Sequence, residues 1–327
     1  MTAYRHHPLG AAARPGQVNE DLLADICRRY YLQDASKIDI ARSLGLSRFK
    51  VARLLEVARS TGIVHISVAV PSRVDRSLSA ELAARLGLDR CVVVDTAGSE
   101  TQMRQDVAVA AAQLLPGLVR EGALLGLTWS RAIDAMVTAL DTLPWCTAVQ
   151  LSGSLAAPAG DPTAADVVQR VARVAGGVAH QVHAPLVVDD PAIAAALRRQ
   201  PGIRDTLQLA ARLDVSVVAI GAWRDGCSTV WQAVSPSIRT AGRRAGAVAE
   251  VSGRLLGADG AAVISPLDDL VIGASLEQLR RPPVRVALVS GPHRAQAAAA
   301  AASAGIVTTL VTTGETAREM LAINDPG

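Results

Sequence analysis

The feature that most constrains this chain is the stretch of residues 36–55, whose pattern predicts two short helices separated by a tight turn. Ser36 is placed to cap the first helix, and Gly45 follows its last apolar residue, where a left-handed C-cap is needed. Ser47 then caps the second helix, which is rich in basic residues. A glycine in the turn and a basic second helix are typical of a helix-turn-helix that binds DNA.

The second of these helices would enter the major groove of DNA with its N-terminal residues against the base edges. Arginine can form a bidentate contact with guanine, whereas lysine supplies a point charge to a base or a phosphate. An ordinary helical hairpin with a solvated basic face explains the same pattern, so this alternative stays open on the stretch alone. The residues that we expect to contact DNA are Ser36, Lys37, Ser47, Arg48, Phe49, Lys50 and Arg53.

The surrounding sequence favours DNA binding over the alternative. Residues 25–32 supply a third helix, as a trihelical core requires, and the alternating residues 63–68 suit the strand of a wing. Residues 1–70 contain ten Lys and Arg against six Asp and Glu, while the rest of the chain contains 23 against 24. The positive excess therefore lies in a small N-terminal part, which suits a polyanion. We predict a flexible tail over 1–17, a winged helix-turn-helix domain over 18–70, and double-stranded operator DNA as the partner.

A further helix is predicted over Asp75–Leu86, where leucines recur four residues apart. It is either a linker helix that pairs between subunits or the first helix of the large domain, and its short leucine stripe slightly favours the second alternative. We assign residues 71–90 to this linker helix and residues 91–327 to an effector domain.

From residue 91 onward, short apolar strands alternate with helices. The predicted strands are Cys91–Asp95, Ala123–Leu127, Ala148–Leu151, Gln181–Val188, Val215–Ile220, Ala261–Ile264, Arg285–Val289 and Ile306–Val311. The predicted helices are Thr101–Leu115, Arg131–Leu140, Ala164–Ala175, Pro191–Arg199 and Arg294–Ala304. Unbroken apolar strands separated by helices indicate a mainly parallel sheet covered on both faces, which is a Rossmann-like α/β/α fold. In such sheets, ligands bind beyond the carboxyl ends of the strands.

The loops after these strands therefore carry the prediction of a ligand site. The loop over 126–131 precedes a helix, so its backbone N–H groups and hydroxyls can cradle a phosphate or a carboxylate. An ordinary capped turn needs the same residue types and stays the alternative. Glu250 is expected on a helix over 245–256. The residues that we expect to bind an effector are Gly126, Thr128, Trp129, Ser130, Arg131, Ser152, Gly153, His183, Glu250, Asp268 and Arg294.

Catalytic patterns are hard to assemble in the same domain. It has no lysine, which excludes Schiff-base chemistry, and a lone histidine in a strand, such as His183, is more often structural. The alternative function is a sugar-phosphate isomerase-like enzyme fused to a DNA-binding domain. That enzyme would need a general acid and a general base, for which Glu250, Asp268, Asp269 and His183 are available without a marked spacing. We predict a regulator rather than an enzyme.

The remaining composition sets limits on cofactors and location. The four cysteines have no paired spacing, so neither a metal site nor a disulfide framework is expected. The sequence has no signal-peptide pattern and no run of about 18 apolar residues, so we expect a cytoplasmic protein without membrane contact. No cofactor is expected.

Several short motifs follow one another along the chain. They are Ser47–Leu55 with Gly62-Ile63-Val64, then Gly126–Trp129, Val149–Gly153, His183–Leu186, Gly246–Glu250 and Leu310–Ala317. Over about residues 18–321, the chain resembles the SorC family of sugar-responsive bacterial transcription regulators. The resemblance implies an effector domain with the fold of sugar-phosphate isomerases, a phosphorylated sugar or polyol as the effector, and a homodimer or homotetramer. It also implies a phosphate loop over 126–130 and an acidic contact at Glu250, with Arg294 near the place where the family often has a lysine.

Overall fold

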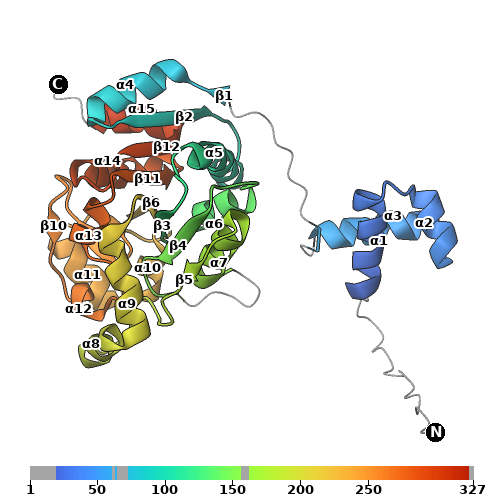
Figure 1. Cartoon of the computed structure of the whole chain (residues 1–327). Coiled ribbons are helices and arrows are strands. Elements are labelled where there is room, and N and C mark those ends of the chain that lie inside the picture. The colour runs from blue at the N-terminus through green and yellow to red at the C-terminus, as the bar shows by residue number, and fades with distance from the viewer. Residues whose placement is uncertain (1–19, 61–62, 65–72, 156–161, 324–327) are drawn as a thin grey trace, which may run out of the picture. The chain divides into compact units, whose positions relative to one another are not determined.

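The computed structural model describes residues 20–60, 63–64, 73–155 and 162–323. The chain divides into two compact units, residues 1–70 and residues 71–327, and Figure 1 shows both with most of their helices and strands labelled. Each unit is described by itself.

The first unit contains three helices, α1 (Glu20–Leu32), α2 (Lys37–Leu44) and α3 (Arg48–Ser60). Their buried apolar side chains form one small core. The Ser36 hydroxyl accepts a hydrogen bond from a backbone N–H in the first turn of α2 at 3.2 Å. Gly45 ends α2 in the left-handed conformation, with a φ of 64°. The two predicted helices and the turn between them are therefore confirmed.

Parts of the predicted N-terminal region are not covered by this description. The tail predicted over 1–17 and residues 65–68 of the predicted wing lie outside the described residues. Ile63 and Val64, where the predicted wing strand begins, form a bend. The wing stays a prediction, as do the domain limits at residues 18, 71 and 91.

The second unit is built on an eight-stranded sheet with the order β1-β2-β12-β11-β6-β3-β4-β5. Its strands are β1 (Arg73–Val74), β2 (Arg90–Asp95), β3 (Ala123–Leu127), β4 (Cys146–Gln150), β5 (Ala179–His180), β6 (Val215–Ala219), β11 (Val284–Val289) and β12 (Thr309–Thr313). β1 is antiparallel to β2, and all other neighbouring strands are parallel. The predicted mainly parallel sheet is confirmed.

Helices cover both faces of this sheet (Figure 1). α5 (Glu100–Leu114), α6 (Arg131–Thr138) and α7 (Ala164–Ala175) share a core with one face, and α4 (Arg76–Leu86), α14 (Ala295–Ser303) and α15 (Gly314–Ile323) share a core with the other. Successive strand residues point to opposite faces. Val93 accordingly belongs to one core and Val94 to the other. The predicted α/β/α arrangement is therefore confirmed.

α4, the helix predicted over Asp75–Leu86, packs on β2 inside the second unit. Its Leu78 and Leu82 are buried in the core of that unit. The hydroxyl of Ser79 accepts a hydrogen bond from the N–H of Val93 at 2.9 Å, which ties the helix to the strand. Leu78 and Leu82 are therefore not available to pair with another subunit.

The helix predicted over 245–256 is wrong, because this segment forms a hairpin in a second, antiparallel sheet. The strands of this sheet are β7 (Gly221–Ala222), β8 (Ala249–Val251), β9 (Arg254–Leu256) and β10 (Ala262–Val263), in the order β10-β9-β8-β7. The hairpin turn has Ser252 at a φ of 52° and Gly253 at 78°, and an α-helix accepts neither value. The strand predicted over 261–264 belongs to this sheet rather than to the parallel one.

The strand predicted over 181–188 is also wrong. The strand in this region is β5, which ends at His180, and the chain beyond it makes only isolated bridges to its neighbours. Pro185 in this segment has no N–H to donate to a strand ladder. The N–H of Val182 bonds to the side-chain oxygen of Gln150 at 3.1 Å instead of to a strand backbone. The strand predicted over 306–311 forms as β12 but begins only at Thr309.

The remaining helices are α8 (Pro191–Arg199), α9 (Pro201–Leu209), α10 (Thr229–Ala233), α11 (Pro236–Arg244), α12 (Leu267–Leu270) and α13 (Leu276–Arg280), with single 3-10 turns at Leu115–Gly117, Ala210–Arg212 and Pro292–Arg294. Within the described ranges, no helix is long and apolar enough to cross a membrane. All four cysteines are free thiols, three of them buried and Cys227 half-buried.

Candidate functional site

α3 presents a basic face to solvent in the first unit. The Ser47 hydroxyl caps the helix by accepting a hydrogen bond from the N–H of Lys50 at 3.1 Å. The α3 side chains buried in the core are Val51, Leu54, Leu55 and Ala58. Arg48, Phe49 and Lys50 in the first turn, and Arg53 in the next, are exposed instead. α3 is thus polarised as a recognition helix must be, with its core face apolar and its outer face cationic.

The cationic side chains on this face are not neutralised by acidic neighbours that the structure describes. Arg42 of α2 pairs with Asp39 at 3.7 Å. By contrast, Arg48, Lys50 and Arg53 make no ion pair with any other residue that the structure describes. No acidic residue occurs in the first turn of α3. A phosphate backbone approaching this turn would therefore meet positive charge that no described neighbour offsets.

The two predicted DNA contacts outside α3 have local partners. Ser36 serves as the cap of α2. The ammonium group of Lys37 lies 5.3 Å from the centroid of the Tyr30 ring, which is a cation–π distance. Their contact with DNA stays a prediction.

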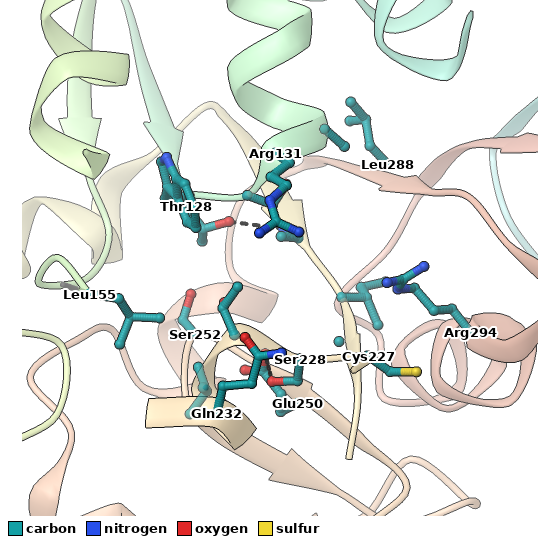
Figure 2. Close-up of a pocket in the computed structure, with 18 of the residues that line it drawn as sticks. Thr128, Arg131, Leu155, Cys227, Ser228, Gln232, Glu250, Ser252, Leu288 and Arg294 are labelled. Carbon is teal, nitrogen blue, oxygen red and sulfur yellow. Dashed lines mark hydrogen bonds between the residues drawn. The ribbon is translucent and has the colours of Figure 1, made fainter. Parts of the chain in front are cut away.

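A pocket of about 150 Å³ opens in the second unit at the carboxyl ends of β3, β4, β6 and β11 (Figure 2). This is the end of a parallel sheet at which ligands are expected. Residues of α5, α6, α10 and β8 complete its wall. The volume holds roughly ten water molecules, which is room for a small sugar derivative.

The loop between β3 and α6 forms one side of the pocket. Thr128 is 4% exposed, and its hydroxyl accepts a hydrogen bond from the N–H of Ala219, at the end of β6, at 2.9 Å. Ser130 caps α6 by accepting a hydrogen bond from the N–H of Ile133 at 3.1 Å. The indole nitrogen of Trp129 is buried and has no acceptor among the described residues.

Three guanidinium groups line the pocket beside this loop. Arg104 comes from α5, Arg131 from the start of α6, and Arg294 from the turn after β11. Burial and the charge of Arg131 lower the pKa of Arg104, an effect that Glu100 opposes and Arg294 increases. Glu100, the acid beside them, is 62% exposed and lies 3.3 Å from His293. The cluster therefore has an excess of positive charge that a bound anion would neutralise.

Glu250 lies across the pocket from Arg131 (Figure 2). It is 6% exposed, and it accepts hydrogen bonds from the Ser228 hydroxyl at 2.9 Å and from the N–H of Gly253 at 3.0 Å. Burial raises the pKa of the Glu250 carboxyl, and the two hydrogen bonds act against that rise. A Cβ at Gly221 would lie 2.6 Å from the carboxyl oxygen, so only glycine leaves room for Glu250 at that point.

Two serine hydroxyls lie in the same wall as Glu250. The hydroxyl of Ser228 also accepts a hydrogen bond from the N–H of Trp231 at 3.0 Å, which caps α10. Ser252 is 8% exposed, and its hydroxyl has no hydrogen-bond partner among the described residues. Its φ of 52° is a strained conformation for a residue other than glycine. A buried hydroxyl without a partner is unfavourable unless a ligand or water pairs with it.

The pocket brings together most of the predicted effector residues. Those that line it are Thr128, Trp129, Ser130, Arg131, Ser152, Gly153, Glu250 and Arg294. Gly126, His183 and Asp268 are not in its wall. Gly126 lies inside β3, where a Cβ would be 2.5 Å from the side chain of Leu213. His183 is exposed.

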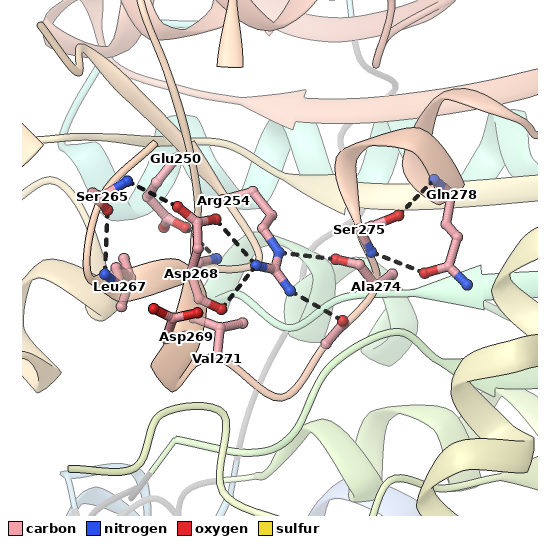
Figure 3. A network of polar contacts seen from close by, with 12 residues as sticks. Glu250, Arg254, Ser265, Leu267, Asp268, Asp269, Val271, Ala274, Ser275 and Gln278 are labelled. Carbon is pink, nitrogen blue, oxygen red and sulfur yellow. Dashed lines mark hydrogen bonds and ion pairs between the residues drawn. The ribbon is translucent and has the colours of Figure 1, made fainter. Parts of the chain in front are cut away.

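Asp268 belongs to a separate polar network (Figure 3). Its carboxylate pairs with Arg254 at 3.1 Å and accepts a hydrogen bond from the N–H of Ser265 at 3.0 Å. Arg254 also donates to the carbonyl oxygen of Ala274 at 3.3 Å. These contacts hold the segment around α12 against β9. The expected effector contact of Asp268 therefore has no support in the structure, because its carboxylate has a structural task.

Several polar residues of the pocket were not predicted. They are Glu100, Arg104, Ser228, Thr229, Gln232, Ser252 and Ser290. Nothing local in the sequence directs the first turn of α5 toward the loop after β3. Ser252 and Gly253, however, form a dipeptide that marks turns, and this signal indicates a hairpin rather than a helix.

The two units together define a class of protein. One carries a helix-turn-helix with an exposed basic face, and the other carries a polar pocket at the strand ends of an α/β sheet. This is the architecture of a transcription regulator whose DNA-binding part is joined to an effector-binding part.

Known proteins are similar to this chain over most of its length. The family model Sugar-bind, a sugar-binding domain, matches residues 72–322. The transcriptional regulator LsrR of Klebsiella pneumoniae subsp. pneumoniae is 30% identical over 312 residues, which cover 93% of this chain and 94% of LsrR. The sorbitol operon regulator of Klebsiella pneumoniae is 25% identical over 308 residues, which cover 92% of this chain and 97% of that regulator.

A solved structure shows the same fold. The crystal structure of the full-length sorbitol operon regulator SorC from Klebsiella pneumoniae matches with a TM-score of 0.69 and 23% identity, and the match covers 92% of this chain and 99% of SorC. The chain therefore belongs to the SorC family of transcriptional regulators with a C-terminal sugar-binding domain.

Proposed function

We propose that this regulator binds double-stranded operator DNA through the exposed face of α3, and that a sugar or polyol carrying an anionic group controls this binding from the pocket. The observation that carries the proposal is the division of the pocket into two sides. One side is formed by guanidinium groups, and the other by a buried carboxyl group with serine hydroxyls. A phosphorylated sugar or polyol complements these two sides, because it has an anionic phosphate at one end and neutral hydroxyl groups along the rest.

The anion would bind on the cationic side. Arg104, Arg131 and Arg294 supply the charge, and the start of α6 adds backbone N–H groups next to the Ser130 cap. Arginine suits this task because its planar donors match two phosphate oxygens at once. A ligand without an anionic group would leave the repulsion among the three guanidinium groups uncompensated.

The hydroxyl groups of the ligand would bind on the opposite side. The hydroxyl of Ser252 has hydrogen-bonding capacity that no described residue satisfies. Glu250 has lone pairs beyond the two hydrogen bonds that it already accepts. The pocket would therefore distinguish between sugars or polyols by their hydroxyl groups, because a ligand lacking the matching hydroxyl would leave these buried groups unpaired.

In this proposal the pocket serves sensing rather than catalysis. Of the four acid–base candidates in the sequence, Glu250 lines the pocket, whereas Asp268, Asp269 and His183 do not. Both oxygens of Glu250 are already engaged by neighbouring donors. Acid–base turnover needs two groups within hydrogen-bond reach of the reacting atoms.

The regulator would act in the cytoplasm, where the operator is accessible, as a homodimer or homotetramer. A single helix-turn-helix reads only a half-site, and regulators of this design place two of them one helical turn of DNA apart. Effector binding can change operator affinity only if the two assembly states bind the effector with different affinity.

Thermal unfolding with a panel of compounds tests the effector part. The panel pairs pentose, hexose and glycerol phosphates with their unphosphorylated counterparts, and inorganic phosphate serves as a control. We expect one phosphorylated compound to raise the Tm and its unphosphorylated counterpart not to, because a ligand of the folded state adds stability. That compound should be recovered unchanged after long incubation with the protein. Its conversion to a product would favour the enzyme instead.

Selection of bound fragments from the organism's own genome tests the DNA part. The selection is run with and without the stabilising compound. We expect a small set of fragments with paired half-sites, whose recovery changes when the compound is present. Unselective recovery under both conditions would contradict the proposal.

A further inference from the structure

Phe49 is the most exposed large apolar side chain among the described residues. It is 85% exposed, and it is the one phenylalanine of the chain. A single exposed apolar residue needs no explanation by its exposure alone. The position of Phe49 in the fold, however, suggests a function for its exposed ring.

Phe49 lies in the first turn of α3, directly after the Ser47 cap. Its sequence neighbours Arg48 and Lys50 are exposed as well. The core residues of α3 begin only at Val51. In a helix-turn-helix, the N-terminal residues of the second helix are those that meet base edges in the major groove. The aromatic ring is therefore held between two cations on the turn that approaches the bases.

The major groove offers one apolar group to such a ring. Thymine carries a C5-methyl group there, and apolar side chains, phenylalanine included, contact it. Two adjacent cations would engage phosphates or guanine and so hold the ring at the base edge. We propose that Phe49 is a specificity-determining residue that reads the methyl group of a thymine in each half-site. This inference rests on the proposed binding of operator DNA.

A second copy of the chain is a less favourable cover for Phe49. In a twofold dimer, the same patch faces itself across the axis. Covering Phe49 in this way would bring Arg48 and Lys50 of one copy toward the same residues of the other, and like charges at an interface are unfavourable. DNA presents the opposite charge beside the apolar methyl group. The charges around Phe49 therefore favour DNA over another protein surface.

The test is selection of bound duplexes from a library with about 30 random base pairs, room for two half-sites. It uses the full-length wild type, Phe49→Ala, Phe49→Leu and the control Leu32→Ala, which alters a residue of the same unit that is 78% exposed at the end of α1. We expect Phe49→Ala to lose the preference for one A·T pair per half-site. Phe49→Leu and Leu32→Ala should keep it.

Replacing that thymine by deoxyuridine then removes only the methyl group. The wild type should bind the substituted duplex about fourfold more weakly for each half-site, the effect of exposing one buried methyl-sized group. Phe49→Ala should bind both duplexes equally. This indifference distinguishes a lost contact from general damage to the helix.

The outcomes separate the two proposals. A wild type that selects no duplex overturns operator binding, and the reading of thymine with it. If the wild type selects duplexes but is indifferent to deoxyuridine, or if Phe49→Ala keeps every base preference, the inference about Phe49 fails while operator binding stands. A Phe49→Ala variant that keeps its base preferences but assembles differently by light scattering would show that the ring contacts another copy of the chain instead.

Discussion

The basic face of α3 and the cationic side of the pocket both offer positive charge to an anion, but in different surroundings. Arg48, Lys50 and Arg53 are exposed on a helix surface. Arg104 and Arg294 are half-buried, and burial lowers the pKa of Arg104. Salt screens exposed charges strongly and half-buried charges much less. The charges of α3 thus act on a polyanion from a distance but are screened by salt, whereas the half-buried charges of the pocket act at close range.

The residues around these two groups of cations differ as well. Phe49 stands among the charges on α3 with no cover in its own unit. In the pocket, Glu250 and Ser252 face the guanidinium groups from the opposite wall and impose a shape on what can bind. A surface that reads a long polymer needs few internal partners, while a pocket for a small ligand needs a complete wall.

The largest expected difference between the two sites is in how strongly salt weakens binding. If the assembled regulator neutralises about six to ten phosphates, operator affinity falls about 10³-fold to 10⁵-fold between roughly 50 and 200 mM salt. The affinity of the pocket for the proposed phosphorylated ligand should fall less than about tenfold over the same range. Arg131 is exposed, but Arg104 and Arg294 are half-buried and are partly shielded from solvent ions. Fluorescence anisotropy on the operator and calorimetry on the ligand measure the two. If salt weakens both affinities equally, the inferred difference in charge screening between the two sites is wrong.

The double variant Arg48→Ala with Arg53→Ala should weaken operator binding about 100-fold, because each arginine contact with a base is worth roughly 1–3 kcal/mol. The Tm and the ligand affinity should stay near those of the wild type, since both side chains are exposed. Arg281→Ala is the matched control, because Arg281 is an exposed arginine of the second unit that pairs with Glu277. Operator affinity at the wild-type level in the double variant would reject α3 as the recognition helix.

Thr128→Val or Glu250→Ala should leave operator binding without ligand near normal and shift the ligand response about tenfold, the equivalent of 1.4 kcal/mol of ligand binding. Both residues also bond to neighbours, so the Tm is expected to fall as well. Ser252→Ala is the cleaner variant, because that hydroxyl has no partner among the described residues. We expect it to weaken the response at an unchanged Tm. If all three variants respond like the wild type, the ligand binds elsewhere.

The smallest effect concerns pH. Burial raises the pKa of the Glu250 carboxyl above its ordinary value of 4.5. Its neutral form is therefore favoured by folding, and the stability linked to it is full below about pH 4.5 and is lost as pH rises through the raised pKa. Relative to Glu250→Gln, the wild type should gain Tm as the pH falls from 7 toward 4.5. A difference that is flat with pH would show that Glu250 keeps its charge throughout. The exposed charges of α3 should add nothing to this difference.

The helix-turn-helix could be predicted because its signals are local. The Ser36 cap and the Gly45 turn act within a few residues of the helices that they limit, and the structure has both as expected. The parallel sheet could be predicted as well, since a strand covered on both faces has an unbroken apolar run in the sequence. Errors began where a segment takes its structure from a distant partner.

The hairpin over 249–256 illustrates this limit. Its alanine-rich approach has good helix propensity, but pairing of β8 with β7, from residues 221–222, overrides that propensity. Glu250 lines the pocket, but it lies on a strand and not on the predicted helix. Asp268 was expected in the pocket because it follows a predicted strand, and His183 because it was expected within one. Neither position tells where a side chain points, and neither residue lines the pocket.

The amino-acid sequence alone therefore specified the two kinds of unit, the helix that we propose to face DNA and the edge of the sheet where a ligand would bind. The folded chain was needed to show which side chains form the pocket. Arg104 and Arg294 are almost two hundred positions apart. The strand order β2-β12-β11-β6-β3 brings the start of α5, which follows β2, and the turn after β11 to one edge of the sheet. Caps and periodicity act through neighbouring residues, whereas a pocket wall is assembled by strand pairing between distant segments, which no local pattern records.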